Sequence, residues 1–409
     1  MIKVVKAVVR AVRNELQTGE SGWVSTSASD ALMSSGYSSK AGQSVTAKSS
    51  LEISAAYDCV RKTSQLIGTL PLTMYERTSD GGKRPVETEL SDILRHQPNS
   101  GQTGVEHWEG QVAAMALKGN SYAEKLEIGN RLVGLRPMFN VTPEADGSNG
   151  KLKYVVLDRG KKYYLPAEKM FHLRGFGAGD GMGLSAIKYG ANSIGAALAA
   201  DETAGRVFSN SMMPSGLITS EQTLNAEQRP QIQDMLSKYV GSSRAGKTLI
   251  LEAGLNYKQI QMNPEDAQLL ETRRFNVEDV CRWFGVPPII VGHASEGQTM
   301  WGSGIEAIML SWLTLGINPL LTRIEARILR DLIPAKDQRR YFFEFNREAM
   351  LQMDSQAKGD FLLKMRMGGF MSGDEGRDKL NLPRRGGSND DLIVQTSLTP
   401  VDLLGKGNK

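Results

Sequence analysis

The segment Pro264–Ile333 reads PEDAQLLETRRFNVEDVCRWFGVPPIIVGHASEGQTMWGSGIEAIMLSWLTLGINPLLTRIEARILRDLI and sets a polar loop between two long helices. The first helix is predicted over Pro264–Phe284. Asn263 is suited to cap it, because an Asn side chain accepts a backbone hydrogen bond and a proline fits the first helical position. Gly285, followed closely by two prolines, ends that helix.

The connecting loop Gly292–Gly304, GHASEGQTMWGSG, contains no Lys or Arg and has too few apolar residues to pack against itself. We therefore expect it to be mobile or to be held by neighbouring parts. The helix after the loop is predicted to break at Pro319, because proline removes a backbone donor and clashes with the preceding turn. This helix–loop–helix arrangement suggests a moving part rather than a catalytic pocket.

Length and composition indicate a globular protein of two or three folding units, with 409 residues of which 40% are hydrophobic and 23% charged. Lys and Arg number 49 against 45 Asp and Glu, and a net charge of +4 is too weak for a dedicated nucleic-acid-binding surface. Any contact with DNA is expected to be loose. Cys59 and Cys281 stand apart and lack a CxxC motif, so we expect neither a disulfide framework nor a zinc site, and no cofactor.

The N-terminal region, residues 1–50, is predicted to be a flexible arm, since its second half is rich in Ser, Gly, Thr and Ala. No apolar run approaches the ~20 residues that cross a bilayer, and no signal-peptide core is visible. We expect no membrane span and assembly in a reducing cytoplasm. The first 16 residues place Lys3, Lys6, Arg10 and Arg13 on one face of a possible helix. This pattern leaves a membrane-associated scaffold open as an alternative.

Residues 51–184 alternate helix and strand patterns in the way typical of an α+β fold with mostly antiparallel pairing. Helices are expected over Leu51–Gly68, Glu89–Arg95 and Val105–Lys118. Strands are expected over Leu70–Arg77, Tyr122–Ile128, Leu132–Met138, Tyr154–Leu157 and Lys162–Leu165.

The glycine-rich run GFGAGDGMG, Gly175–Gly183, does not fit the G-x-G-x-x-G spacing of a dinucleotide-binding loop, and no βαβ unit surrounds it. We interpret it as a flexible hinge. Ser185 is predicted to cap an alanine-rich helix that runs to about Asn210. This helix and the helix Pro264–Phe284 flank a small insert, Met213–Met262, and so form a stalk with a small domain at its tip. A stalk needs neighbours to bury its apolar sides, which predicts a side-by-side oligomer such as a closed ring.

GSSRAGKT, Gly241–Thr248, matches the phosphate-loop pattern G-x-x-x-x-G-K-[ST] at every specified position, and it makes a P-loop NTPase the main enzymatic alternative. A phosphate loop needs a strand before it and a helix after it. Here a predicted helix, Asn225–Val240, comes first and a strand follows. We interpret the segment as a helix-to-strand turn with Lys247 in solvent, and we expect no catalytic residues.

Six segments stand in a distinctive order along the chain: YDCVRKTSQLIGTLPLTMYE, LRHQPNSGQT, LKGNSYAE, PSGLI, DAQLLETRRFNVEDVCRWFGVPP and the Arg-Ile-Glu at 323–325. In this order they resemble the portal proteins of tailed double-stranded DNA phages, the ring at one capsid vertex through which the genome is pumped. Asp374, Glu375 and Arg377 hold the places of an Asn-Glu-x-Arg-like signature of that family. Gly304 and Ala186 replace an Asn and a Pro that are usual there.

The resemblance implies an α+β portal-like subunit with an α/β wing, two long stem helices flanking a small α/β clip, and a helical C-terminal crown, assembled as a ring. The implied parts are the arm 1–50, the wing 51–184, the first stem helix 185–212, the clip 213–262, the second stem helix 263–285, the tunnel loop region 286–304, a kinked helix and a strand returning to the wing 305–346, the crown 347–390 and a flexible tail 391–409.

The resemblance also implies sites and partners. The tunnel loop would contact DNA in the channel through Glu296, Gln298, Thr299 and Trp301. The alternative for Trp301 is that its side chain packs into the wing core and anchors the loop. The stem residues expected to pack between subunits are Ala197, Ala200, Val277 and Val280. The implied partners are a dodecameric ring of the same chain, sequence-independent double-stranded DNA, the terminase large subunit, a head–tail adaptor, and the major capsid and scaffold proteins. The implied location is the portal vertex of the virion.

Overall fold

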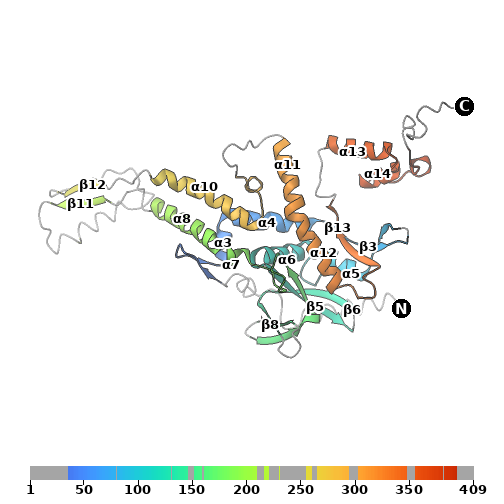
Figure 1. The fold of residues 1–409 in the computed structure, drawn as a ribbon, viewed down its shortest axis with the longest axis horizontal. Helices are drawn as coiled ribbons and strands as arrows, with labels where there is room; N and C mark the ends of the chain where they lie inside the picture. Colours follow the sequence, from blue (N-terminus) through green and yellow to red (C-terminus); the bar gives the residue numbers. More distant parts are fainter. Residues whose placement is uncertain are drawn as a thin grey trace. The chain divides into compact units, whose positions relative to one another are not determined.

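The computed structural model describes residues 36–79, 81–129, 131–145, 152–158, 161–209, 216–220, 230, 255–259, 265–293, 303–347, 355–380 and 382–393. The chain divides into two compact units, Met1–Phe345 and Asn346–Lys409. The first unit mixes helices with small antiparallel sheets (Figure 1), so the predicted α+β class is observed.

The described chain begins with a short hairpin and a helix, β1 (Tyr37–Ser38), β2 (Ser44–Val45) and α3 (Ala47–Glu52). Thr46 caps α3 in a capping box with Ser49, which satisfies backbone donors at the start of the helix. Val45 and Ala47 are buried. The prediction of a flexible arm up to residue 50 is therefore wrong for residues 36–50, while residues 1–35 lie outside the described part.

Three three-stranded sheets of the first unit are built from the strands β3 (Leu72–Arg77), β4 (Lys83–Pro85), β5 (Asn120–Ile128), β6 (Arg131–Met138), β7 (Val141–Ala145), β8 (Leu152–Asp158), β9 (Lys161–Pro166), β10 (Met170–Arg174) and β13 (Tyr341–Phe345). They form antiparallel sheets in the orders β10-β5-β6, β13-β3-β4 and β7-β8-β9. β13 pairs with β3 in the register Phe343↔Met74. The strand YFFEF at 341–345 thus pairs with a strand more than 260 residues earlier in the chain.

Helices cover these sheets: α4 (Ser54–Thr69), α5 (Glu89–Arg95) and α6 (Gly104–Lys118). The predicted helix Leu51–Gly68 is divided at Ile53, whose extended backbone ends α3 and precedes α4. Trp108 on α6 donates a 2.9 Å hydrogen bond to the Leu94 carbonyl, which ties α6 to α5. α6 ends where Gly119 takes a φ of 77°, a conformation that favours glycine.

The predicted first stem helix begins at Ser185, whose side chain accepts a hydrogen bond from the Lys188 backbone N–H. It is interrupted at Gly190 into α7 (Ala186–Tyr189) and α8 (Ala191–Ser209). A Cβ at Gly190 would press on the Trp283 ring, 2.9 Å away, so the glycine lets the two stem segments approach closely. The second stem helix, α10 (Glu265–Phe284), runs beside α8 as predicted (Figure 1).

Between the stem helices, β11 (Gly216–Ser220) pairs antiparallel with β12 (Leu255–Gln259). After α10 come a short 3-10 helix, η3 (Pro288–Val291), then α11 (Ser303–Ser311), a π-helical turn, η4 (Trp312–Ile317), and α12 (Asn318–Asp331). The helix is therefore irregular at residues 312–317, before Pro319, rather than at Pro319 as predicted. Pro319 lies in the first turn of α12, where its missing N–H costs nothing, and the irregularity falls on the π turn before it.

The glycine run Gly175–Gly183 is a closely packed loop rather than the flexible hinge that we expected. A Cβ at Gly183 would collide with the Gly119 carbonyl, and a Cβ at Gly177 would collide with the Met182 carbonyl. Gly175 donates a 2.8 Å backbone hydrogen bond to Gly119. The glycines are needed here because backbone meets backbone without room for a side chain.

The second unit contains α13 (Ser355–Met367), α14 (Gly373–Lys379) and a 3-10 turn, η6 (Gly387–Asn389). Ser372 and Glu375 form a capping box at the start of α14. The buried Asp374 carboxylate accepts backbone hydrogen bonds from Arg385 at 3.0 Å and Gly386 at 2.6 Å. Arg377 donates to the Pro383 carbonyl at 2.8 Å. The Asp-Glu-x-Arg signature therefore closes the following loop onto α14, and Gly376 does not prevent the helix from forming.

Candidate functional site

The residues that we expected to face DNA, Glu296, Gln298, Thr299 and Trp301, lie outside the described residues, as does the phosphate-loop match at 241–248. The described residues just before the predicted tunnel loop are held by α4 and α10. Gly292 ends η3 with a φ of 80°, and Lys62 of α4 donates to the Ile290 carbonyl. His293 lies with its Nε2 3.8 Å from a carboxylate oxygen of Glu278 on α10. One end of the loop is thus fixed to α4 and α10.

The C-terminal part of α10 packs against α4. Val280, Cys281 and Val286 are buried there, and the Sγ atoms of Cys59 and Cys281 are 3.8 Å apart. From two separate cysteines without a CxxC motif we expected no disulfide framework, and 222 residues separate them in the chain. The fold brings them into contact, although they do not form a disulfide.

The stem helix α8 is covered on one side by the N-terminal hairpin and on another by α10. The Lys40 backbone N–H donates to the Asn192 side-chain oxygen at 3.0 Å, and Gln43 donates to Glu202 at 2.5 Å. The Trp283 indole N–H donates to the Ser193 hydroxyl at 3.1 Å. These contacts join α8 to the N-terminal hairpin and α10 to α8 within the same chain.

This packing corrects part of the expected subunit contact. Ala197 and Val280 are buried within their own chain, 5% and 0% exposed, so neither is available to a neighbouring subunit. The sequence pattern marked them correctly as apolar helix positions but did not show which neighbour covers them. Ala200 and Val277 are half-buried and retain accessible surface.

The α12 helix is attached to the wing by hydrogen bonds to backbone carbonyls. Arg323 donates to the Gly175 carbonyl at 3.0 Å, and Arg327 donates to the His172 carbonyl at 2.9 Å. The Glu325 carboxylate accepts from the Phe345 backbone N–H at 2.8 Å. The Arg-Ile-Glu at 323–325 therefore joins α12 to the glycine loop and to β13, with Ile324 fully buried between its charged neighbours.

His172 sits in a buried polar network under α12. Its Nε2 is 2.9 Å from the Asn120 side-chain oxygen, and its Nδ1 is 3.1 Å from the Tyr154 hydroxyl. Burial, helped by Arg174 and Arg327, lowers the pKa of His172 to about 3, so the ring is neutral. Asn120 also bonds to both the N–H and the carbonyl of Gly183, each at 2.8 Å. The network is a structural clamp on the glycine loop.

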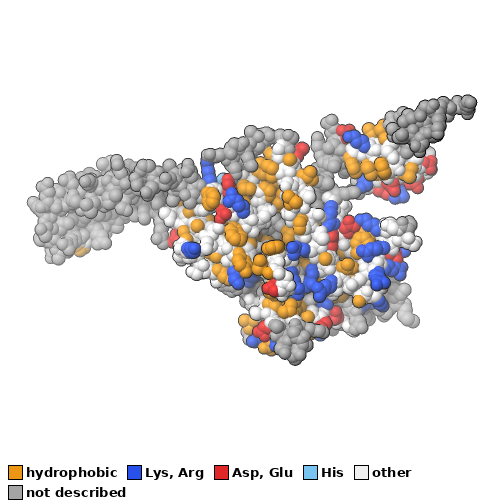
Figure 2. All heavy atoms as spheres, viewed as in Figure 1, with side chains coloured by type: hydrophobic (Ala, Val, Ile, Leu, Met, Phe, Trp, Pro, Cys, Tyr) orange, Lys and Arg blue, Asp and Glu red, His pale blue; other side chains and the backbone are white. Residues whose placement is uncertain are grey.

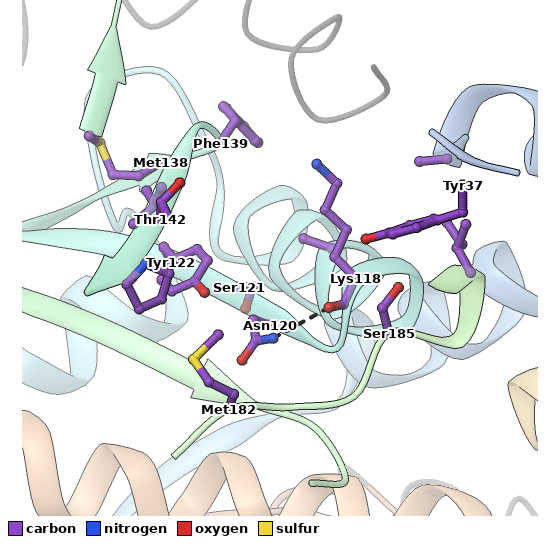
Figure 3. Close-up of a pocket in the computed structure, with 15 residues that line it drawn as sticks. Tyr37, Lys118, Asn120, Ser121, Tyr122, Met138, Phe139, Thr142, Met182 and Ser185 are labelled. Atoms are coloured by element: carbon purple, nitrogen blue, oxygen red, sulfur yellow. Dashed lines mark hydrogen bonds between the residues drawn. The ribbon is translucent and has the colours of Figure 1, made fainter. Parts of the chain in front are cut away.

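A cavity of about 230 Å³ opens beside this clamp, between the N-terminal hairpin and the sheets (Figure 3). In Figure 3 the Tyr37 side chain points toward Lys118 and Ser185. Burial lowers the pKa of Lys118. Within the described residues no group of three or more His, Cys, Asp or Glu side chains is placed to hold a metal ion.

Large apolar side chains gather on the surface of α10 and α11. Phe275 and Trp283 of α10 are 58% and 40% exposed, and Met309 and Leu310 of α11 are 48% and 53% exposed. Figure 2 shows hydrophobic side chains on the surface of α11. Leu315, in the π turn, is 75% exposed. Exposed apolar side chains on α11 and the π turn are typical of surfaces that bind another protein.

The continuous helix Gly304–Asp331 contains an 18-residue window with a mean hydropathy of 1.4, so it satisfies the length and composition criteria for a membrane span. This was missed in the sequence because Pro319 and scattered polar residues interrupt the run. A core helix of a soluble protein meets the same criteria.

Comparison with known proteins identifies the family. A family model described as phage portal protein matches residues 54–381. The chain belongs to the phage portal protein family. It is 31% identical over 360 residues to the portal protein of Enterobacteria phage HK97, an alignment that covers 87% of this chain and 84% of the relative. Membership makes it a component of the virion at the capsid vertex, where phage DNA is packaged and ejected.

Solved structures share the fold. A chain of the neck of a native gene transfer agent particle, computed with C12 symmetry, superposes with a TM-score of 0.55 at 21% identity, covering 92% of this chain and 99% of that chain. An HK97 family phage portal protein from Corynebacterium diphtheriae superposes with a TM-score of 0.53 at 15% identity, covering 75% of this chain and 96% of that chain. The comparisons give no support to the P-loop NTPase alternative.

Proposed function

We propose that twelve copies of this chain form a closed ring whose channel carries double-stranded DNA, as a non-enzymatic conduit. The observation that carries the proposal is the exposed apolar surface of α10, α11 and the π turn, which a lone subunit leaves in water. A closed ring of heterologous contacts covers such a surface on every subunit at once. The likeness to a neck chain with C12 symmetry supports the subunit number.

Native mass measurement of the assembled protein tests this proposal. The expected mass is close to twelve times the subunit mass of 44.7 kDa. A stable monomer or an open filament under assembly conditions contradicts the ring. Addition of detergent serves as a control, because a membrane-associated scaffold would bind detergent on its apolar helix and a ring would bind none beyond background.

The apolar helix Gly304–Asp331 fits a ring subunit better than a membrane span. Its C-terminal half carries Arg323, Glu325 and Arg327, which bond to backbone groups of the wing. These hydrogen bonds attach that half to the surface of its own subunit, with Leu321, Ile324 and Ile328 buried beneath it. The exposed apolar side chains belong to the N-terminal half, which covers too few residues to cross a bilayer alone.

We further propose that the segment Gly292–Gly304 lies at the channel and touches the sliding DNA without gripping it. In support, one end of the segment is held on α4 and α10 through Ile290 and His293, and the other begins α11 at Ser303. The segment has no Lys or Arg and carries Glu296, so it avoids strong phosphate pairing. Gln298, Thr299 and Trp301 are the proposed weak contacts.

Glu296→Lys tests the loop proposal. It places a new cation on every subunit beside the duplex, so ring formation should stay normal while DNA packaging or retention falls. Glu296→Gln is the matched control and should change packaging far less. Packaging of the Lys variant at the wild-type level contradicts the channel position.

The remaining partners follow from the proposed ring. The clip containing β11 and β12 is proposed to dock the terminase large subunit during packaging and a head–tail adaptor afterwards. The wing is proposed to contact the major capsid and scaffold proteins. Pull-down of each partner with a ring lacking residues 216–259, compared with the intact ring, tests the clip assignment, since only terminase and adaptor binding should be lost.

A further inference from the structure

Cys59 and Cys281 meet at the contact between the wing and the second stem helix. Cys59 is on α4 and Cys281 on α10, and neither residue has exposed surface. Their Sγ atoms are 3.8 Å apart. A disulfide bond is about 2.05 Å long, so the sulfur atoms need to approach by only about 2 Å, a shift that packed helices can make.

We propose that Cys59 and Cys281 form a disulfide bond when the protein meets a small oxidant, and that this bond ties the second stem helix to the wing. The proposal concerns a covalent site within one subunit and does not rest on the ring. The sequence contains only 2 cysteines, so this pair is the one disulfide that can form inside the chain.

A small oxidant has a place beside the pair. Cys59 lines a cavity of about 290 Å³ that is also bounded by Met115 of α6, Trp283 of α10 and Trp312 of the π turn. A water molecule takes about 30 Å³ of liquid volume, and hydrogen peroxide is about twice that size, so the cavity admits peroxide. A bulky disulfide such as oxidised glutathione is much larger than this space.

Hydrogen peroxide is the oxidant of the two thiols. The two thiols give up two hydrogen atoms and the S–S bond forms, while the O–O bond of peroxide breaks and two water molecules leave. The Cys59 thiol donates its proton toward Cys281, and this hydrogen bond together with burial raises the pKa of Cys59. The same hydrogen bond lowers the pKa of Cys281. Cys59, which borders the cavity, meets peroxide and becomes a sulfenic acid with release of one water molecule. The Cys281 sulfur is the one better suited to attack the Cys59 sulfur next, which forms the S–S bond and releases the second water molecule.

The bond would act on the base of the tunnel loop. α10 leads through Gly285 into η3 and then into Gly292. Fixing Cys281 to α4 therefore restricts the same helix end that positions the loop. The host cytoplasm keeps thiols reduced, whereas a released virion meets an oxidising medium. We expect the bond to be absent during assembly and present in released particles.

The experiment uses the assembled wild-type protein. It is treated with hydrogen peroxide, denatured, alkylated and digested, and the peptides are mapped by mass spectrometry without reductant. The expected result is one cross-linked peptide pair that contains Cys59 and Cys281, in subunits that still migrate as monomers on a non-reducing gel. The melting temperature should rise by roughly 5 °C or more. Dithiothreitol should reverse both changes.

Cys59→Ser and Cys281→Ser each remove one sulfur and should abolish the cross-link and the rise in melting temperature. Cys59→Ala is the matched control for the cost of burying a hydroxyl, and it should behave as Cys59→Ser does toward peroxide. The proposal is overturned by two alkylated thiols in every oxidised subunit, by cysteines oxidised separately to sulfonic acids, or by a disulfide between subunits. These outcomes are read on the wild-type protein and need no variant to fold.

Discussion

The two halves of the helix Gly304–Asp331 have opposite surroundings. In α12 the apolar residues Leu321, Ile324 and Ile328 have no exposed surface, whereas in α11 and the π turn Met309, Leu310 and Leu315 are about half to three-quarters exposed. Both halves are apolar in sequence. The difference shows that hydrophobic periodicity marks a surface for burial without saying whether the same chain or another covers it.

Polar contacts follow the same division. α12 bonds through Arg323, Glu325 and Arg327 to three backbone groups of the wing. These bonds fix one orientation of α12, because each buried partner would otherwise lose its hydrogen bond. The α12 half is thus covered within the subunit, and the α11 half is the part that a neighbour would cover in the proposed ring.

Replacing Ile324 with Ala should damage the covered half most. The side chain is fully buried, so the cavity should lower the free energy of unfolding by about 2–5 kcal/mol. Denaturant unfolding of wild type and variant measures the change. Leu315→Ala, on the exposed half, is the matched control and should change the unfolding free energy of the subunit by about 0.5 kcal/mol or less. Equal losses of unfolding free energy for the two variants would contradict the difference in burial between the two halves of the helix.

Leu315→Asp should break assembly while sparing the fold. If a neighbouring subunit covers this surface, the new carboxylate at position 315 would be buried without a partner. Burying it costs ~3 kcal/mol at each subunit contact. Ring yield by size-exclusion chromatography should fall sharply, with an unchanged far-ultraviolet circular dichroism spectrum. Leu315→Gln controls for loss of apolar area alone. Normal rings with Asp at 315 would remove the π turn from the interface.

Tryptophan at Ala197 and at Ala200 should separate contacts within the subunit from contacts between subunits. Ala197 is buried by its own chain, so Trp should overpack the fold and lower the unfolding free energy by about 1–3 kcal/mol. Ala200 keeps accessible surface, so Trp there should leave the subunit folded and reduce ring yield. If Ala200→Trp assembles as wild type does, that position faces solvent.

Acid should weaken the wing beneath α12. The pKa of His172 is lowered to about 3 in the folded chain, against an ordinary value of 6.5. The unfolded chain therefore binds the proton first, and stability that is complete above pH 6.5 is lost as the pH falls toward 3. The slope should reach at most about 1.4 kcal/mol per pH unit for this group. Denaturant unfolding across this range, with His172→Gln as the comparison, measures it. Identical slopes would show that His172 does not contribute.

Much of the local structure was predictable from the sequence. The predicted range Glu89–Arg95 agrees with α5, and the predicted cap at Ser185 agrees with the start of α7, because helix ends depend on neighbouring residues only. β7 was not predicted, since Pro143 lies within it and proline argues against a central strand. β10 was not predicted because a run of five residues is short for a periodicity signal.

The site was predictable only where it depends on local sequence. The stem helices and the bounds of the loop follow from Pro, Gly and apolar spacing. The contact of Cys59 with Cys281, the anchoring of α12 by Arg323, and the burial of Ala197 depend on pairs far apart in the chain. A single sequence carries no signal for such pairs.

Cryo-electron microscopy of the assembled protein tests most directly whether the exposed half of Gly304–Asp331 is a subunit contact of a portal ring. We predict a closed ring with twelve-fold symmetry, as in the similar neck structure, in which each neighbour covers Leu315 and residues 292–304 line the channel. A ring in which Leu315 faces solvent, or a protein that stays monomeric under assembly conditions, would contradict the account.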